Sequence, residues 1–347
     1  MEGGTIINKF KLFKNKICII VSMALIFSVG ISPVYAFANL DQKDNPKQTF
    51  DIDAKSGILI DSSSGDIIYE KNIHEKLPPA SITKIMVMLL AMEDLESKKI
   101  TLEDKVVVSQ NAAKMGGSQV YLEEGEVQTV QDLLKAIALR SANDASTALG
   151  EHLSGSLDLF IDRMNKRAKE LGMKNTHFKN TTGLPDEEHY STAYDVSVMS
   201  RELLKHPKIN DWLSLWMGEI KVGKKKDVTQ NLVNTNNLIK FYQGANGIKT
   251  GFTNDAGFCL SASAKRGNLS LISVILGCNT AQVRFNETKK LLDYGFAMYD
   301  SVTVNKKGDL IKKLPVAKGN IKETSIVTQD SLNILIKKVK IKIYKKK

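Results

Sequence analysis

Residues 78–90 read PPASITKIMVMLL, and this stretch decides how the rest of the chain is interpreted. The two prolines stop whatever strand precedes them, and apolar residues then follow at helical spacing and almost all round the helix, which predicts a central, buried helix. Ser81 opens that helix, and the i,i+3 spacing puts Lys84 on the same face one turn later. Taken alone, Ser81 is better explained as a helix N-cap.

Two further short motifs follow in the chain, SAN at Ser141–Asn143 and KTG at Lys249–Gly251. Singly they carry little weight, because a lysine-rich chain of this length contains roughly two or three S-x-x-K strings by chance. SAN alone could cap a helix, and Lys249 alone could be an exposed strand residue. Their occurrence in this order, after a serine on a buried helix, indicates one composite site.

The chemistry that suits this set is acyl transfer without histidine. A serine hydroxyl is a poor nucleophile until a neighbouring base takes its proton. Lys84 can be that base only if burial or another cation lowers its pKa. The apolar helix supplies the burial, and Lys249 can supply the cation. The start of the helix also offers the backbone N–H of Ser81 to a developing oxyanion.

The pattern around these motifs predicts an α+β fold. Two short β-type runs flank Ser62–Gly65, and helices are predicted over 129–152, 157–171 and 194–206. Residues 221–230 are interpreted as a solvated turn. A strand is predicted around 248–253, then a hairpin joined by Lys265–Asn268, then a helix over 281–300. A sheet with strands from both ends of the chain and a helical insertion between them follows from this order.

The net charge of +11 belongs to the two ends of the chain. Residues 1–38 carry +3 and residues 306–347 carry +10, whereas 39–305 sum to −2. This distribution favours adhesion to an anionic membrane or wall polymer through the lysine-rich C-terminus, and it disfavours nucleic acid as a partner. Residues 1–38 combine lysines, an apolar run and the small-residue stretch VYAFA, which predicts a cleaved export signal; a retained membrane anchor is the alternative.

Cysteine and histidine spacing predicts neither a disulfide nor a metal site. Pairing about the turn at 265–268 puts Cys259 opposite roughly Val274 and not opposite Cys278, so both are expected to be buried small hydrophobes. The five histidines have no metal-ligand spacing, and no cofactor is expected.

The ordered S-x-x-K, S-x-N and K-T-G set resembles the penicilloyl-serine superfamily of β-lactamases and penicillin-binding proteins. Within it, the stretches PPASITKIM, RSANDASTALGEH, MNKRAKELGMKNTHFKNTTGL, NGIKTGFTNDAGFCLSASAKR and RFNETKKLLDYGF look like those of the low-molecular-mass D-alanyl-D-alanine carboxypeptidases, serine peptidase family S11. The resemblance implies a β-lactamase/transpeptidase-like domain over 39–299, after the signal peptide that the pattern of residues 1–38 predicts. It also implies that 300–347 are a short, incomplete β-rich module, ending in an alternating strand-like tail.

The resemblance further implies that the chain removes the terminal D-alanine from peptidoglycan stem peptides, is acylated by β-lactams and acts outside the cell. Ser81 would attack the penultimate carbonyl, Lys84 would accept its proton, and Ser141 would relay a proton to the departing amine. Asn143 would bind the acyl side and steady Lys84. The oxyanion would be held by the backbone N–H groups of Ser81 and Phe252.

The same resemblance places the terminal carboxylate of the substrate on the third motif. Lys249 and Thr250 would bind it, and Arg284 would orient it electrostatically. Gly251 would let the substrate approach the backbone. At Phe252 some relatives carry histidine, so no side-chain role is carried over to it.

Two other functions compete with this interpretation. A class A-type β-lactamase needs a glutamate in an E-x-x-L-N string to activate the deacylating water, and the segment at Glu170–Lys174 does not match it. A penicillin-binding sensor would be acylated without turnover, and the complete Ser/Lys/Ser/Lys set argues against lost catalysis.

Overall fold

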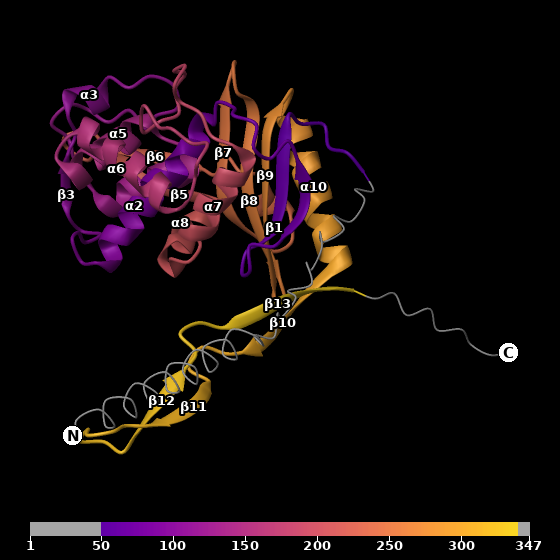
Figure 1. Ribbon diagram of the computed structural model, residues 1–347. Helices are drawn as coiled ribbons and strands as arrows, with labels where there is room; N and C mark the ends of the chain where they lie inside the picture. The colour runs from indigo at the N-terminus through magenta and orange to yellow at the C-terminus, as the bar shows by residue number, and fades with distance from the viewer. Residues whose placement is uncertain (1–49, 339–347) are drawn as a thin grey trace, which may run out of the picture. The chain divides into compact units, whose positions relative to one another are not determined.

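The computed structural model describes residues 50–338, and its centre is a five-stranded antiparallel sheet in the order β2-β1-β9-β8-β7 (Figure 1). Two strands that precede the helices and three that follow them meet in this sheet, so the predicted α+β fold with a helical insertion is confirmed. The strands are β1 (Ser56–Asp61), β2 (Ile67–Lys71), β7 (Ala245–Thr253), β8 (Gly257–Arg266) and β9 (Leu269–Cys278).

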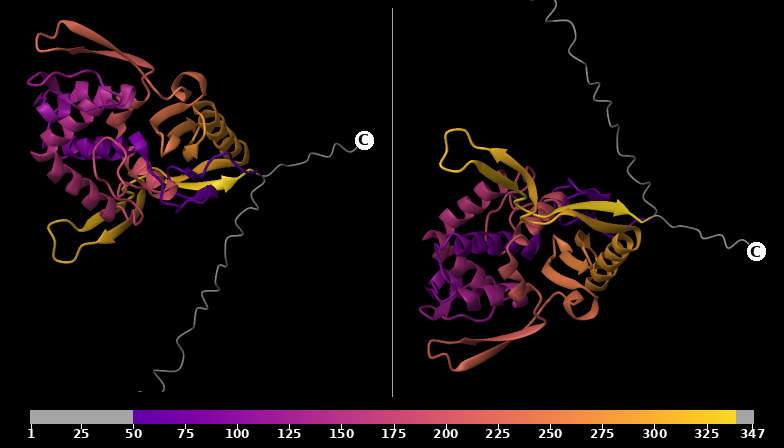
Figure 2. Two further views of the ribbon diagram at one scale, coloured as in Figure 1. Left: turned by 90° about the horizontal axis from the view of Figure 1, so that it is seen from above. Right: turned by 90° about the horizontal axis from the view of Figure 1, so that it is seen from below.

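The chain between β2 and β7 forms the helical insertion on one side of the sheet, while α10 (Ala281–Met298) packs on the other side (Figures 1 and 2). The main helices of the insertion are η1 (Ala80–Thr83), α2 (Lys84–Glu96), α4 (Val130–Arg140), α5 (Asn143–Ser154), α6 (Leu157–Glu170) and α7 (Ala193–Leu203). Shorter pieces are β3 (Lys105–Val107), α3 (Gln110–Ala113), β4 (Val127–Thr129), η2 (Pro207–Ile209), α8 (Asn210–Leu213), β5 (Met217–Val222), β6 (Val228–Val233) and α9 (Leu238–Phe241).

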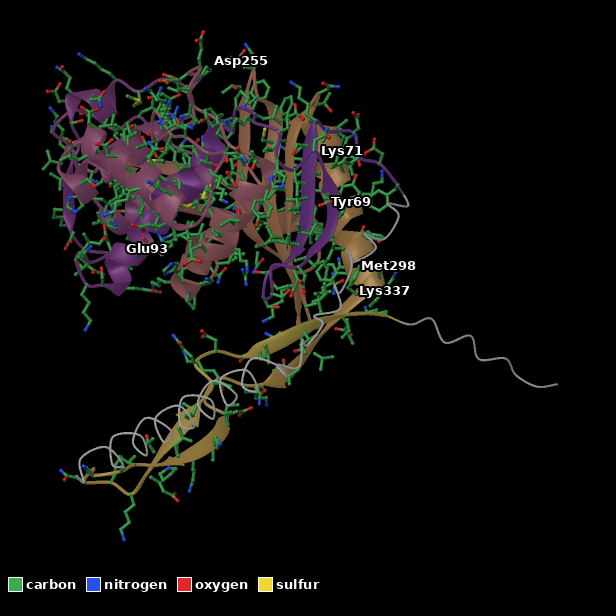
Figure 3. The ribbon with its side chains drawn as sticks, in the orientation of Figure 1. Tyr69, Lys71, Glu93, Asp255, Met298 and Lys337 are labelled. Carbon is green, nitrogen blue, oxygen red and sulfur yellow. The ribbon has the colours of Figure 1, made fainter. Side chains whose placement is uncertain are left out.

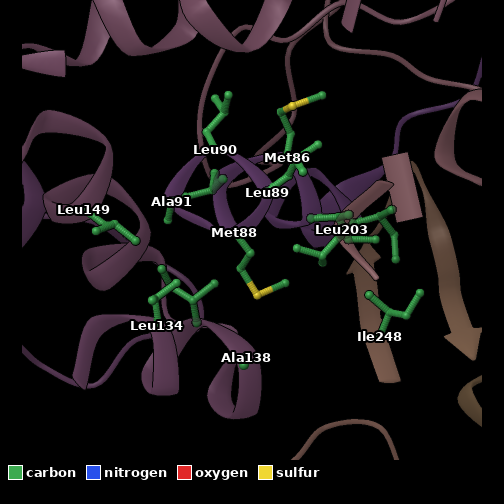
Figure 4. Close-up of a cluster of buried hydrophobic side chains, with 14 of the residues drawn as sticks. Met86, Met88, Leu89, Leu90, Ala91, Leu134, Ala138, Leu149, Leu203 and Ile248 are labelled. Atoms are coloured by element: carbon green, nitrogen blue, oxygen red, sulfur yellow. The ribbon is translucent and has the colours of Figure 1, made fainter. Parts of the chain in front are cut away.

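Helix α2 runs through the middle of the core, as its all-round apolar sequence predicts. Every residue from 85 to 92 is buried. Figure 4 shows side chains of this stretch, Met86, Met88, Leu89, Leu90 and Ala91, among Leu134 and Ala138 of α4, Leu149 of α5, Leu203 of α7 and Ile248 of β7. Truncating one such buried side chain to alanine costs about 2–5 kcal/mol of stability. The packing of the core therefore holds the first turn of α2 in place.

The predicted helix over 129–152 is wrong in one respect, because it breaks after Arg140. Ser141 has φ 63°, in the left-handed region, and it ends α4 before α5 starts at Asn143. Neither glycine nor proline marks this break in the sequence. The left-handed serine is held by tertiary contacts, such as the Asn143 N–H donating to the Ser118 carbonyl at 2.7 Å.

The register of the β8–β9 hairpin also differs from the prediction. Its turn is Gly267-Asn268 alone, with Gly267 at φ 58°, so Lys265 and Arg266 extend the strand. Cys259 therefore does not face Val274, which pairs with Ser261. An irregularity next to Cys259 instead brings Phe258 opposite Cys278, and both cysteines are buried free thiols.

Residues 299–338 are β-rich, as predicted. They form two separate two-stranded sheets, β10–β13 and β11–β12, whose apolar side chains are largely exposed. The joint with α10 is a backbone bond from the Lys338 N–H to the Met298 carbonyl at 2.8 Å, beside Lys337 (Figure 3). The strands are β10 (Tyr299–Asn305), β11 (Leu310–Pro315), β12 (Glu323–Val327) and β13 (Leu332–Lys337).

The predicted export signal over 1–38 and the strand-like end of the tail lie outside the described residues. Between residues 50 and 338, no helix combines the length and hydropathy needed to cross a bilayer.

Candidate active site

Ser81 lies in the short 3₁₀ turn η1 that leads into α2, and it is the second residue of that turn. The residue before it, Ala80, has φ 47°, which turns the chain sharply after the prolines. The Ser81 hydroxyl oxygen lies 3.0 Å from Lys84 Nζ, and the two side chains are thus in hydrogen-bond contact. The predicted Ser81–Lys84 pair is brought together as the spacing implied.

Lys84 is completely buried, and its Nζ has three oxygen partners. Besides Ser81 Oγ, these are Asn143 Oδ1 at 2.7 Å and the Thr182 backbone carbonyl at 2.7 Å. Burial lowers the pKa of Lys84 well below its ordinary value, and the charge of Lys249 lowers it further, while Asp144 partly opposes the shift. A neutral amine keeps two hydrogens, which match the amide and carbonyl oxygens, so its lone pair is left for the hydroxyl of Ser81.

The Thr182 carbonyl is a part of the site that sequence reasoning missed. It belongs to a tight loop in which Asn180 Oδ1 accepts hydrogen bonds from the Thr182 N–H and hydroxyl and from the Gly183 N–H, at 2.7–3.1 Å. Gly183 has φ +80°, and a Cβ there would lie 1.8 Å from the Ala80 carbonyl oxygen. The loop therefore packs directly on the backbone that carries Ser81.

Ser141 and Asn143 come from the break between α4 and α5. The Ser141 hydroxyl is buried and has no hydrogen-bond partner within the described part of the chain. Asn143 donates from Nδ2 to the Gly116 carbonyl at 2.6 Å, which orients its Oδ1 toward Lys84. The Ser141 hydroxyl is thus unpaired and shielded from solvent, whereas Asn143 is already engaged at both ends.

Lys249 is buried on β7, the edge strand of the sheet, and its Nζ donates to the Thr250 carbonyl at 3.0 Å. Burial and the charge of Arg284 lower the pKa of Lys249 to about 7. The hydroxyl of Thr250 lies 2.7 Å from that of Thr235, so it too is held in place.

Gly251 faces the η1 turn that carries Ser81. A Cβ there would meet the Pro79 carbonyl at 3.0 Å and Ala80 Cβ at 3.2 Å, so the glycine lets η1 pack against β7. Phe252 is 50% exposed and stacks on Phe258 with 4.3 Å between ring centroids.

Arg284 is buried and lies behind the strand that carries Lys249. Its Nη1 donates to the carbonyls of Gly251 and Cys259 at 3.3 Å, and its Nε has no partner in the described residues. Its guanidinium also lies 4.5 Å from the centroid of the Phe285 ring. Among residues 50–338, Arg284 forms no ion pair with an acidic side chain. Its charge therefore acts on Lys249.

A cavity of about 380 Å³ opens over Ser81. Of the predicted residues, Ser81, Asn143 and Phe252 border it, whereas the others do not, namely Lys84, Ser141, Lys249, Thr250, Gly251 and Arg284. A larger cavity of about 460 Å³, near Asp255, contains none of the motif residues, so we assign the chemistry to the smaller one. Its lining comprises Ser81, Gly117, Ser118, Gln119, Tyr121, Arg140, Asn143, Thr182, Gly183, Leu184, Phe252 and Thr253.

His189 supports the η1 turn that carries Ser81, and sequence reasoning missed it as well. Its Nε2 lies 2.8 Å from the Thr83 hydroxyl, and its Nδ1 accepts from the Lys179 N–H at 3.1 Å. The Thr83 hydroxyl in turn donates to the Ala80 carbonyl at 2.8 Å. Burial lowers the pKa of His189 to about 4, so it is neutral at pH 7 and donates from Nε2 to Thr83.

Comparisons with known proteins agree with this geometry. The family model Peptidase S11, described as D-alanyl-D-alanine carboxypeptidase, matches residues 42–280. The chain is 46% identical to D-alanyl-D-alanine carboxypeptidase DacF of Bacillus subtilis, over 87% of this chain and 77% of that one. It is 38% identical to DacC of Escherichia coli, over 73% and 63%.

Among solved structures, penicillin binding protein 5 from Haemophilus influenzae superposes with a TM-score of 0.73 at 31% identity, covering 83% of this chain and 84% of that one. The family match, the fold and the Ser–Lys pair lead to one conclusion: the chain belongs to the peptidase S11 family of D-alanyl-D-alanine carboxypeptidases, serine hydrolases with a penicillin-binding fold.

Proposed function

We propose that this chain hydrolyses the terminal D-Ala–D-Ala bond of peptidoglycan stem peptides through an acyl-enzyme on Ser81. The observation that carries the proposal is the environment of Lys84, whose Nζ lies 3.0 Å from Ser81 Oγ and 2.7 Å from each of two fixed acceptors. A neutral Lys84 gives its two hydrogens to those acceptors and takes the proton of Ser81 with its lone pair.

In the acylation step, Ser81 Oγ forms a bond to the carbonyl carbon of the penultimate D-Ala while its proton moves to Lys84. The oxyanion of the tetrahedral intermediate accepts hydrogen bonds from the N–H groups of Ser81 and Phe252. When the intermediate collapses, the C–N bond breaks, and the departing amine receives a proton through the Ser141 hydroxyl. Water then adds to the ester, and the shortened peptide leaves with a new carboxylate.

The terminal carboxylate of the substrate is assigned to Lys249 and Thr250. Lys249 and Arg284 are two buried cations in this part of the site, and within residues 50–338 neither forms an ion pair with a carboxylate. A buried cation without a counter-ion favours the binding of an anion. Arg284 acts at a distance, by its charge and by fixing the carbonyls of Gly251 and Cys259.

A β-lactam presents an amide carbonyl and a carboxylate in the same relation, so it acylates Ser81 too. The lining of the cavity contains no Asp or Glu among the described residues, so a β-lactamase-type deacylating glutamate has no counterpart there. The acyl-penicillin is therefore expected to be long-lived. A sensor would also be acylated, but it would release no D-Ala from peptides.

Fluorescent penicillin labelling and D-Ala release from diacetyl-Lys-D-Ala-D-Ala test the proposal together. Ser81→Ala should abolish both, and Ser214→Ala, at an exposed hydroxyl bonded only within its own helix, serves as the matched control. Lys84→Arg should lose at least about a hundredfold in acylation, since arginine cannot act as a base near neutral pH. Labelling of Ser81→Ala, or labelling of the wild type without D-Ala release, contradicts the proposal.

We also propose that the protein is exported and that its lysine-rich end adheres to anionic membrane or wall polymer. The support is the composition of the two ends, +3 over 1–38 and +10 over 306–347, together with a cell-wall substrate. A variant with Lys345, Lys346 and Lys347 changed to glutamine should bind anionic vesicles more weakly at low salt. Equal binding of wild type and variant would mean that the lysines are only solvated.

A further inference from the structure

Arg140 is a cation at the active site for which the proposed reaction has no use. It is the last residue of α4, directly before Ser141, and it borders the cavity over Ser81. It is exposed, and within residues 50–338 neither an ion pair nor a hydrogen bond of its side chain is recorded. It is also the only charged side chain in the described lining of that cavity.

Tyr121 borders the same cavity from the loop between α3 and β4. Its side chain is 67% exposed, and its backbone has φ 60°, a conformation that residues other than glycine seldom adopt. An exposed aromatic ring on a strained backbone does not contribute to the core, and such strain persists only where the surroundings impose it.

Asp144 imposes that conformation. Its completely buried carboxylate accepts the Val120 N–H at 3.1 Å and the Leu122 N–H at 3.0 Å, on either side of Tyr121. The same loop is bonded to the site again through Asn143, whose Nδ2 donates to the Gly116 carbonyl. The ring of Tyr121 is thus presented at the cavity by the residue that follows the S-x-N motif.

We propose that Arg140 and Tyr121 form a subsite for a carboxylate-bearing residue of the stem peptide, upstream of the scissile bond. This inference rests on the proposed function. Lys249 already accounts for the terminal carboxylate, so an additional cation in the lining suits a second carboxylate on the same ligand. The ring of Tyr121 covers the hydrocarbon part of that residue.

Two peptide pairs test the subsite and distinguish two positions of the carboxylate. In the first pair, the residue before D-Ala-D-Ala is glutamate or glutamine. In the second pair, that residue is acetyl-lysine and the one before it is γ-linked D-glutamate, with its α-carboxylate free or amidated. Wild type should have a kcat/KM about two- to fivefold higher for the carboxylate member of one pair, as for a partly exposed ion pair, and added salt should reduce the preference.

Arg140→Gln should remove that preference, and Arg140→Lys should retain most of it. A cation that only complements the C-terminal end of α4 would give equal losses on both members of a pair, which would overturn the proposal. Tyr121→Ala should raise KM more than it lowers kcat, and unchanged kinetics in that variant would remove Tyr121 from the subsite. If wild type releases D-Ala from none of the four peptides, the proposed function itself fails, and the subsite fails with it.

Discussion

Replacing Gly183 by alanine should slow acylation without preventing folding, because Gly183 is where the Thr182 loop touches the backbone of Ala80 and Ser81. A Cβ at this position would lie 1.8 Å from the Ala80 carbonyl oxygen, 2.2 Å from the Ala80 carbonyl carbon and 2.9 Å from the Ser81 nitrogen. Real Cβ atoms essentially never approach closer than 3.0 Å. Because backbone atoms form the contact, no side-chain rotation can relieve it.

The required movement is large compared with the precision that catalysis needs. The distance from Cβ to the Ala80 oxygen would have to grow from 1.8 Å to at least 3.0 Å, which displaces either the turn carrying Ser81 or the Thr182 carbonyl that holds Lys84. A misplacement of about 1 Å can cost on the order of a hundredfold in rate. We therefore expect the penicillin acylation rate of Gly183→Ala to fall by about a hundredfold.

Gly155→Ala is the matched control. Gly155 has φ +81°, almost the same as Gly183, but a Cβ there would meet nothing within 4 Å. Both variants incur the left-handed conformational cost of about 1–2 kcal/mol, and only Gly183→Ala has the clash. Stopped-flow acylation and urea unfolding of the two variants separate the effects. If folded Gly183→Ala acylates within about threefold of Gly155→Ala, the loop does not position the Ser81–Lys84 pair.

Three further changes test the electrostatics of the site. The kcat/KM profile against pH should rise as Lys84 loses its proton and fall as the pH passes about 7, where Lys249 loses its charge. Lys249→Arg should move the falling limb of the profile to higher pH. If the falling limb does not move, a group other than Lys249 is responsible for it. Because the folded pKa of His189 is about 4 and the unfolded value about 6.5, the unfolded state binds more protons between these pH values. Between pH 6.5 and pH 4, the free energy of unfolding should therefore fall by about 3 kcal/mol more in wild type than in His189→Gln. An equal fall in both proteins, measured by urea unfolding, would contradict this. Arg284→Met should lower kcat/KM about tenfold more for a peptide with a free terminal carboxylate than for its amide, and equal losses would mean that Arg284 only braces β7 and β8.

Several features could be predicted from the sequence because they depend on local pattern. The largely apolar stretch after Pro79 predicts a buried helix whatever surrounds it, and the i,i+3 spacing alone puts Lys84 beside Ser81. The alternating strands and the glycine turn predict the hairpin after β7. The three motifs in order predicted the family.

Other features depended on which distant segments pack together. The third partner of Lys84 is the backbone carbonyl of Thr182, and a carbonyl group has no residue type that a sequence pattern could reveal. The left-handed turn at Ser141 is held by contacts to a loop more than twenty residues earlier. The helical periodicity of the sequence continues across Ser141 and therefore does not indicate this turn.

The pKa values of the charged groups depend on the tertiary structure. The pKa of Lys249 is lowered to about 7 by burial and by Arg284, which comes from a helix on the other side of the sheet. The sequence by itself determined which groups are present and which of them are neighbours along one helix. The tertiary structure alone decided how far each group is removed from water and which charges face it, because desolvation and Coulomb interactions depend on distances through space and not along the chain.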